Sequence, residues 1–132
     1  MSKMKGLKGM HHLALQVKDV KASKAFYQEM FGMEIVWEPD EKNVYLSSGT
    51  DNLALHEVDL PEGLSRPNEH LDHLGFIIDR IETVKELEKE FRTKKVTIVH
   101  PFKNHRDGSA SFYCADPDGI VIQLLYEPHL SR

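Results

Sequence analysis

The stretch SFYCADPDGIVIQ, residues 111–123, decides the fold because the chain carries a related stretch earlier. That earlier stretch is VYLSSGTDNLALH, residues 44–56, and it can be laid on the later one without a gap. In both, two strand-like runs flank a polar turn that contains Gly and Asp, a pattern typical of a β-hairpin. The chain is therefore predicted to build the same hairpin twice.

A second pair of matching segments precedes these hairpins. HLALQVKD, residues 12–19, lies on HLGFIIDR, residues 73–80. Apolar residues at helical spacing follow each segment, and Gly32 is a natural stop for the first helix. Two more strands, over 33–39 and 96–100, are predicted to end at Pro39 and Pro101, respectively. Each half thus has the order strand, helix and three strands.

An internal repeat of this length predicts paired modules that share one core. We expect a single domain over residues 1–132, with modules at about 9–60 and 71–128. Residues 61–70 are rich in Pro, Gly and polar side chains, which is typical of a linker. The predicted fold class is α+β, with two βαβββ modules.

Composition excludes several classes of partner. The chain has 132 residues and a net charge of −4, which disfavours nucleic acid and anionic membranes. No apolar run approaches the roughly 20 residues that cross a bilayer. The N-terminus lacks the features of a secretory signal, and Cys114 is the only cysteine, so we expect a cytoplasmic protein.

The repeat also selects four polar positions within otherwise apolar strands. His12 falls on His73, and His56 falls on Gln123. Imidazole is the commonest transition-metal ligand in proteins, and three His with one amide oxygen suit Zn, Ni, Co, Mn or Fe(II). We therefore predict a divalent metal site at His12, His56, His73 and Gln123, with open positions for water or substrate.

The other histidines are not predicted to be ligands, because a lone His in a strand is usually a structural side chain with a hydrogen-bond partner. His11 neighbours His12 but points to the opposite sheet face, so it is expected to be structural or exposed. His100 has no repeat support and is expected in a loop or at the surface. Trp37 and Tyr45 could line an apolar pocket, but a place in the core is favoured.

At these residues the chain resembles a known superfamily. HHLALQVKDVKASKAFYQEMFGM near the start, DHLGFII at mid-chain and SFYCADPDGIVIQLL near the end are similar to the vicinal oxygen chelate superfamily. That group includes glyoxalase I, methylmalonyl-CoA epimerase, extradiol dioxygenases, fosfomycin-resistance enzymes and bleomycin-binding proteins. The resemblance covers about Met10 to Glu127 and implies a cup-shaped, eight-stranded mixed sheet with helices outside and a divalent metal in the cup.

The resemblance implies the same four ligands, with one departure. Most metal-using relatives have Glu where this chain has Gln123. A neutral amide binds metal more weakly and cannot act as a general base. The Fe(II) site of two His and one carboxylate is therefore incomplete, which makes a dioxygenase less favoured than a lyase or isomerase/epimerase. His56 favours the glyoxalase or epimerase arrangement.

Three further residues are candidate contacts to substrate. In extradiol dioxygenases, which this stretch resembles, a tyrosine at the spacing of Tyr113 orients the substrate, so Tyr113 is a candidate catalytic residue. His105 and Arg106 form a charged loop, and Arg106 could hold a carboxylate or phosphate. A packed aromatic and an ordinary exposed loop are the alternatives. Cys114 is expected to face away from Tyr113 and to be inert.

Two functions remain open. The first is a metal-dependent enzyme that acts on a small oxygen-rich molecule. The second is a metal-free small-molecule binding or drug-sequestering protein of the bleomycin-resistance type, which Gln123 favours and the three His oppose. A homodimer is expected in either case, because an open cup leaves sheet edges uncovered.

Overall fold

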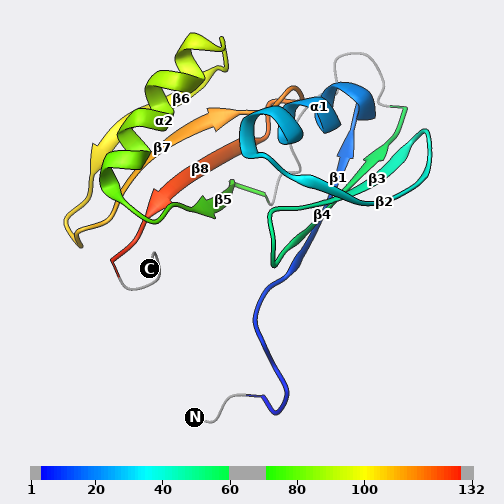
Figure 1. The fold of residues 1–132 in the computed structure, drawn as a ribbon, viewed down its shortest axis with the longest axis horizontal. Helices are drawn as coiled ribbons and strands as arrows, with labels where there is room; N and C mark the ends of the chain where they lie inside the picture. Colours follow the sequence, from blue (N-terminus) through cyan, green and yellow to red (C-terminus); the bar gives the residue numbers. More distant parts are fainter. Residues whose placement is uncertain (1–3, 60–70, 129–132) are drawn as a thin grey trace. The chain divides into compact units, whose positions relative to one another are not determined.

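The computed structural model describes residues 4–59 and 71–128 (Figure 1). These residues form eight strands and two helices, and the chain divides into two compact units, Met1–Asp59 and Leu60–Arg132. Each unit has the order strand, helix and three strands, which confirms the prediction of two βαβββ modules. The predicted linker, 61–70, lies outside the described residues.

The first unit contains one four-stranded mixed sheet and one helix. Its strands stand in the order β1-β4-β3-β2, with β1 parallel to β4 and the other neighbours antiparallel. The elements are β1 (His12–Val17), α1 (Val20–Phe31), β2 (Glu34–Asp40), β3 (Asn43–Ser47) and β4 (Asn52–Glu57).

The second unit repeats this topology. Its strands stand in the order β5-β8-β7-β6, with β5 parallel to β8 and the other neighbours antiparallel. The elements are β5 (Leu74–Ile77), α2 (Ile81–Thr93), β6 (Ile98–Asn104), β7 (Ala110–Ala115) and β8 (Val121–Tyr126). In both units a right-handed crossover through a helix is the usual way to join two parallel strands.

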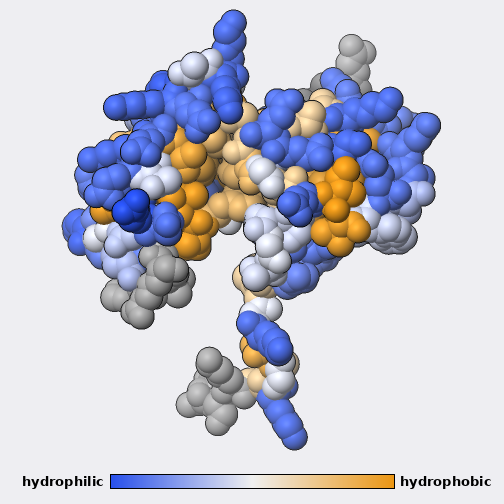
Figure 2. Space-filling view, viewed as in Figure 1, coloured by the Kyte–Doolittle hydropathy of each residue, from blue (hydrophilic) through white to orange (hydrophobic). Residues whose placement is uncertain are grey.

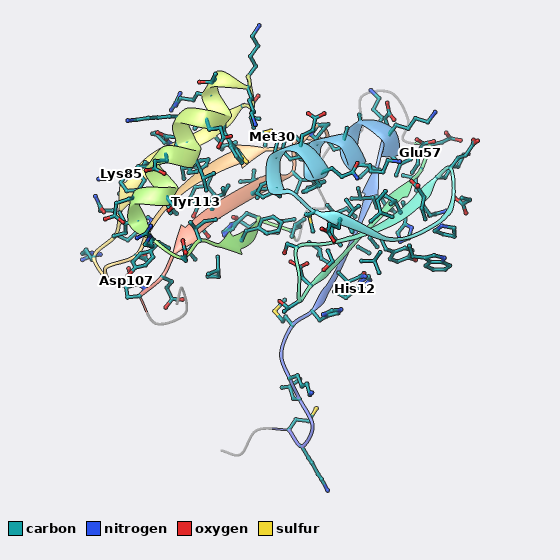
Figure 3. The ribbon with its side chains drawn as sticks, viewed as in Figure 1. His12, Met30, Glu57, Lys85, Asp107 and Tyr113 are labelled. Carbon is teal, nitrogen blue, oxygen red and sulfur yellow. The ribbon has the colours of Figure 1, made fainter. Side chains whose placement is uncertain are left out.

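The ends of α1 follow from local sequence. Asp19 caps the N-terminus, where its Oδ1 accepts hydrogen bonds from the backbone N–H groups of Lys21 and Ala22. Glu57 on β4 accepts a third, from the N–H of Val20, at 3.0 Å, so the sheet is tied to the helix (Figure 3). Gly32 ends the helix at φ 62°, a left-handed conformation that favours glycine, and confirms the predicted stop.

The core of each unit lies between its sheet and its helix. In the second unit Phe91 of α2 meets Phe112 of β7 edge to face, with ring centroids 5.5 Å apart, and both side chains are fully buried. In the first unit Tyr27 of α1 is fully buried with alternate residues of the strands. The buried apolar strand residues are Leu15, Val17, Val44, Leu46, Leu53, Ala54, Leu55, Ala110, Phe112, Cys114, Ile122 and Leu124.

Two prolines do not end their strands, contrary to the prediction. Pro39 lies within β2 and Pro101 lies within β6. Both strands are sheet edges, and each shows a register irregularity next to its proline. Proline lacks an N–H donor, so an edge or a bulge is where a strand tolerates it.

No helix of the described residues is long and apolar enough to cross a membrane.

Cys114 is expected to be unreactive in the folded protein. Its side chain is fully buried, and burial raises the pKa of the thiol from its ordinary value of 9.0 to about 12. Iodoacetamide at pH 8 should therefore label it slowly in buffer and rapidly in urea. The thiol ionises at a lower pH in the unfolded chain than in the folded one. Its contribution to the free energy of unfolding is therefore complete below pH 9 and is lost as the pH rises towards 12. Rapid labelling of the native protein would contradict its placement.

Candidate functional site

Strand register corrects the alignment of the two halves. Gln123 lies opposite Gly75 on β5 and Tyr113 on β7. The corresponding residue of the first unit is Ala54, which lies opposite Ala14 on β1 and Tyr45 on β3. The gapless alignment placed His56 on Gln123, and this equivalence is wrong by two residues. The two hairpins differ in the lengths of their turns, which a gapless alignment hides.

The same register separates His12 from His56. His12 pairs with Asn52, so His56 lies four residues further along β4. At about 3.3 Å per residue this is roughly 13 Å along the strand direction. The two rings also have different partners, since His12 Nδ1 lies 2.7 Å from Asn52 Oδ1 and His56 Nδ1 lies 2.6 Å from Asn43 Oδ1. Within one unit, His12 and His56 therefore occupy separate places along the sheet.

Hydrogen bonds leave one ring nitrogen of His12 and His73 available. His73 Nδ1 lies 2.6 Å from Asp72 Oδ1, and His12 Nδ1 lies 2.7 Å from Asn52 Oδ1. An ionised carboxylate only accepts, so His73 Nδ1 carries a proton, and in the neutral ring this leaves the lone pair on Nε2. A metal-binding His has this arrangement. His11 Nδ1 also meets an oxygen, the carbonyl of Thr50, so the bond alone does not identify a ligand.

Gln123 is held by a buried hydroxyl. Its Nε2 donates to Ser111 Oγ at 3.1 Å, and Ser111 Oγ also lies 2.9 Å from His105 Nε2. The amide oxygen faces the other way, 3.7 Å from where a side chain at Gly75 would begin. A glycine within a strand marks a close approach of this kind. The chain thus offers an oxygen donor beside β5, two residues from His73.

A pocket of about 680 Å³ opens on this face of the second unit. Imidazole, ammonium and phenol groups line it, and Asp72 is the one acidic residue among the lining residues. A space of this size suits a small molecule rather than a polymer. The lining residues are Asp72, His73, Val99, His100, Pro101, Phe102, Lys103, His105, Ser111, Tyr113 and Val121.

Tyr113 lines the pocket and contacts two other lining residues. Its ring meets those of His73 and His100 edge to face, at centroid distances of 5.3 Å and 5.2 Å. It projects from β7, while Asp107 lies in the loop before that strand (Figure 3). The predicted candidate Tyr113 is thus in the pocket, and so is His105. Arg106 is exposed and does not line it.

The loop that carries His105 is locally fixed. Asp107 Oδ1 accepts hydrogen bonds from the hydroxyl of Ser109 at 2.6 Å and from its backbone N–H at 2.9 Å. These two bonds hold the pKa of Asp107 below its usual value. The backbone N–H of His105 also donates to the Ser109 carbonyl at 2.8 Å. His105 therefore has a defined position at the pocket.

The corresponding face of the first unit is different. Trp37 stacks on Tyr45 with centroids 5.1 Å apart, and it is 58% exposed, which contradicts the expectation that it fills the core. Its strand β2 also exposes Ile35 and Val36, and apolar surface is visible on this unit (Figure 2). An edge strand has fewer neighbours to cover it, which explains the error.

His56 belongs to this face and has its own partners. Its Nδ1 lies 2.6 Å from Asn43 Oδ1, and Asn43 Nδ2 donates to Asp40 at 2.9 Å. Hydrogen bonds from the backbone N–H of Lys42 and the side chain of Asn43 lower the pKa of Asp40. Its carboxylate therefore fixes the amide, which in turn fixes the imidazole.

Among residues 4–59 and 71–128, no three His, Cys, Asp or Glu side chains gather as a metal-binding group. His73 and Gln123 lie on one sheet face in the second unit, and His12 belongs to the first unit. The donor types still fit a divalent transition metal, because an imidazole nitrogen and an amide oxygen are both free to bind.

Sequence reasoning missed Ser111, His100 and Lys103. Ser111 stood in the repeat, but the slipped alignment matched it with Val44, a core residue. His100 lies on the edge strand β6 within the predicted strand, whereas Lys103 lies beyond Pro101, where that strand was expected to end. A proline read as an edge marker instead of a stop would have placed Lys103 on the sheet as well.

Comparisons with known proteins agree with this fold. YaeR of Escherichia coli is 33% identical over 135 residues, covering 92% of this chain and 98% of that protein. The glutathione transferase FosA of Serratia marcescens is 27% identical over 120 residues, covering 89% and 80%. The crystal structure of lactoylglutathione lyase from Agrobacterium tumefaciens superposes with a TM-score of 0.77 at 23% identity, covering 97% of this chain and 100% of that one.

A family model extends the likeness over most of the chain. It matches residues 9–124, which include both repeated halves and every candidate ligand. The chain belongs to the Glyoxalase/Bleomycin resistance protein/Dioxygenase superfamily.

Proposed function

We propose that the protein is a divalent-metal-dependent enzyme that acts on a small, oxygen-rich substrate. The observation that carries this proposal is that His73, which lines a pocket of about 680 Å³, shares a sheet face with Gln123, the partner of Gly75 two residues along. A free imidazole nitrogen and an oriented amide oxygen are ligands with no obvious use in a pocket that only sequesters a drug.

The proposed ligands are His73, Gln123 and His12, and the metal is Zn, Ni, Co, Mn or Fe. Sequence repetition brings His12 into the set, because it corresponds to His73, and its Nδ1 bond to Asn52 leaves Nε2 free. His56 was part of the expected set, and its distance from His12 along β4 removes it from the proposal. When bound, the ion would act as a Lewis acid that polarises a substrate oxygen.

The chain's own residues would bind the rest of the substrate. Tyr113 can donate a hydrogen bond to a substrate oxygen. Lys103 gives the pocket a positive charge that suits a carboxylate or phosphate group, and Arg106 in the loop of His105 could add a bidentate contact. The substrate class is therefore a small anion.

Gln123 limits the reaction type. An amide has no titratable proton and cannot serve as a general base, so proton transfer would fall to an imidazole such as His100 or His105. Gln123 also stands at the position where an Fe(II) oxygenase site would have its carboxylate ligand. We therefore favour a lyase or isomerase/epimerase reaction. Thiol transfer is a further candidate reaction, because the relatives FosA and FosB are named a glutathione transferase and a metallothiol transferase.

We further propose a homodimer in the cytoplasm. The exposed edge strand β2, with Ile35, Val36 and Trp37, is a surface that a second copy could cover. A lone, fully buried cysteine agrees with a reducing compartment. The sedimentation coefficient of the purified protein should be that of a dimer.

Metal titration tests the proposed enzyme. We expect chelator-treated protein to bind about one equivalent of Mn, Co, Ni or Zn per chain in calorimetry. Gln123→Glu should bind the preferred ion at least about tenfold more tightly, since a carboxylate adds a charge that the amide lacks. Turnover of thiol adducts and of small anionic oxo compounds should then require the ion.

Less than about a tenth of an equivalent, for wild type and Gln123→Glu alike, would contradict the proposal. If a small molecule binds the same protein and a chelator leaves that binding unchanged, the drug-sequestering function is supported instead.

A further inference from the structure

Ser111 stands out because it is a buried hydroxyl that touches two polar side chains of the site. Its side chain is 1% exposed on β7. Its Oγ accepts from Gln123 Nε2 at 3.1 Å and lies 2.9 Å from His105 Nε2. A hydroxyl has one proton and two lone pairs, so Ser111 Oγ can accept from Gln123 and still donate to His105.

One arrangement satisfies all three groups. With Gln123 Nε2 donating to Oγ, the Ser111 proton is free to be donated to His105 Nε2, and the neutral His105 ring carries its proton on Nδ1. Each bond in such a chain strengthens the next, because the hydroxyl that donates becomes a better acceptor. The chain runs from amide to hydroxyl to imidazole, and it ends on a loop that Asp107 and Ser109 hold in place.

The hydrogen bond to Ser111 fixes the orientation of the Gln123 amide. An amide that is bound through its nitrogen must turn its oxygen to the opposite side, where Gly75 leaves space. A free glutamine would present nitrogen and oxygen equally, and an NH2 group has no lone pair for a metal. A glutamate would need no such control, because both of its oxygens are donors.

We propose that Ser111, backed by His105, is a positioning residue that holds Gln123 with its carbonyl oxygen towards β5. This explains how an uncharged amide supplies an oxygen donor at a position where most metal-using relatives carry Glu. The metal-binding part of the proposal rests on the proposed function, whereas the orientation of the amide does not.

Nitrogen-15 NMR of the metal-free full-length protein tests the orientation. The Gln123 side-chain signal is assigned by its loss in Gln123→Glu, and Gln16, exposed on β1, is the internal control. We expect one Gln123 amide proton to exchange about tenfold more slowly than those of Gln16, as one hydrogen bond implies. Ser111→Ala should remove this protection, and Ser111→Thr should restore it. Protection that survives in Ser111→Ala overturns the proposal.

Two further measurements keep the test decisive. His105→Ala, a change in a loop, should also speed the exchange and covers the case in which Ser111→Ala does not fold. In the metal titration, Ser111→Ala should weaken binding about tenfold, the usual effect of losing a group that orients a ligand. Unchanged affinity overturns the role in metal binding. If wild type binds no metal, the proposed function fails while the NMR result still decides the orientation.

Discussion

Replacing Phe112 with alanine should lower the free energy of unfolding by about 3–5 kcal/mol. Phe112 is fully buried on β7, where its ring meets that of Phe91 on α2 edge to face at 5.5 Å. Its removal takes apolar surface out of the core and leaves a cavity between sheet and helix, and both effects destabilise the folded state. Urea denaturation followed by circular dichroism measures the loss.

Phe102→Ala is the matched control for this prediction. Phe102 is only partly buried on the edge strand β6, and its ring contacts the Lys85 ammonium at 5.3 Å. An exposed contact of this kind contributes about 0.5–1 kcal/mol, so the loss should be well below that of Phe112→Ala. Equal losses from the two variants would mean that α2 does not pack on β7 as described.

Much of the fold could be predicted from the sequence because it depends on patterns that are local. The helix start at Asp19 and its stop at Gly32 follow from capping chemistry, and the strand–helix–three-strand order follows from periodicity. The prolines were misread because sequence alone does not show which strands are edges. A proline would break a central strand, but Pro101 is tolerated because β6 lies at the edge of its sheet.

The candidate site depended on register, which is harder to predict. A slip of one residue turns a side chain to the other face of a sheet, and the gapless alignment made such a slip when it placed Tyr45 on Phe112. Tyr45 lies on the polar face and corresponds to Tyr113, whereas Phe112 is core. His12 and His73 were aligned correctly because no hairpin turn separates them from the start of their modules.

The corrected register predicts that the histidines differ in their contribution to metal binding. We expect His73→Ala to reduce the affinity for the preferred divalent ion by about 100-fold or more, which is at least about 2.7 kcal/mol. His73 is a proposed ligand whose Nδ1 is held by Asp72 at 2.6 Å, so its loss removes a metal–nitrogen bond and not merely a supporting contact. His12→Ala should behave in the same way. Calorimetric titration of chelator-treated protein gives the dissociation constants.

His56→Ala is the control that makes this measurement informative. His56 carries the same kind of bond, from Nδ1 to Asn43 Oδ1 at 2.6 Å, so hydrogen bonding alone would rank it beside His12 and His73. Register ranks it differently, because His56 lies four residues from the partner of His12. The affinity of the His56→Ala variant for the ion should therefore stay within about threefold of wild type, which is a change in binding free energy of under roughly 0.7 kcal/mol. A loss as large as that of His73→Ala would return His56 to the ligand set and contradict the ligand set proposed from the register.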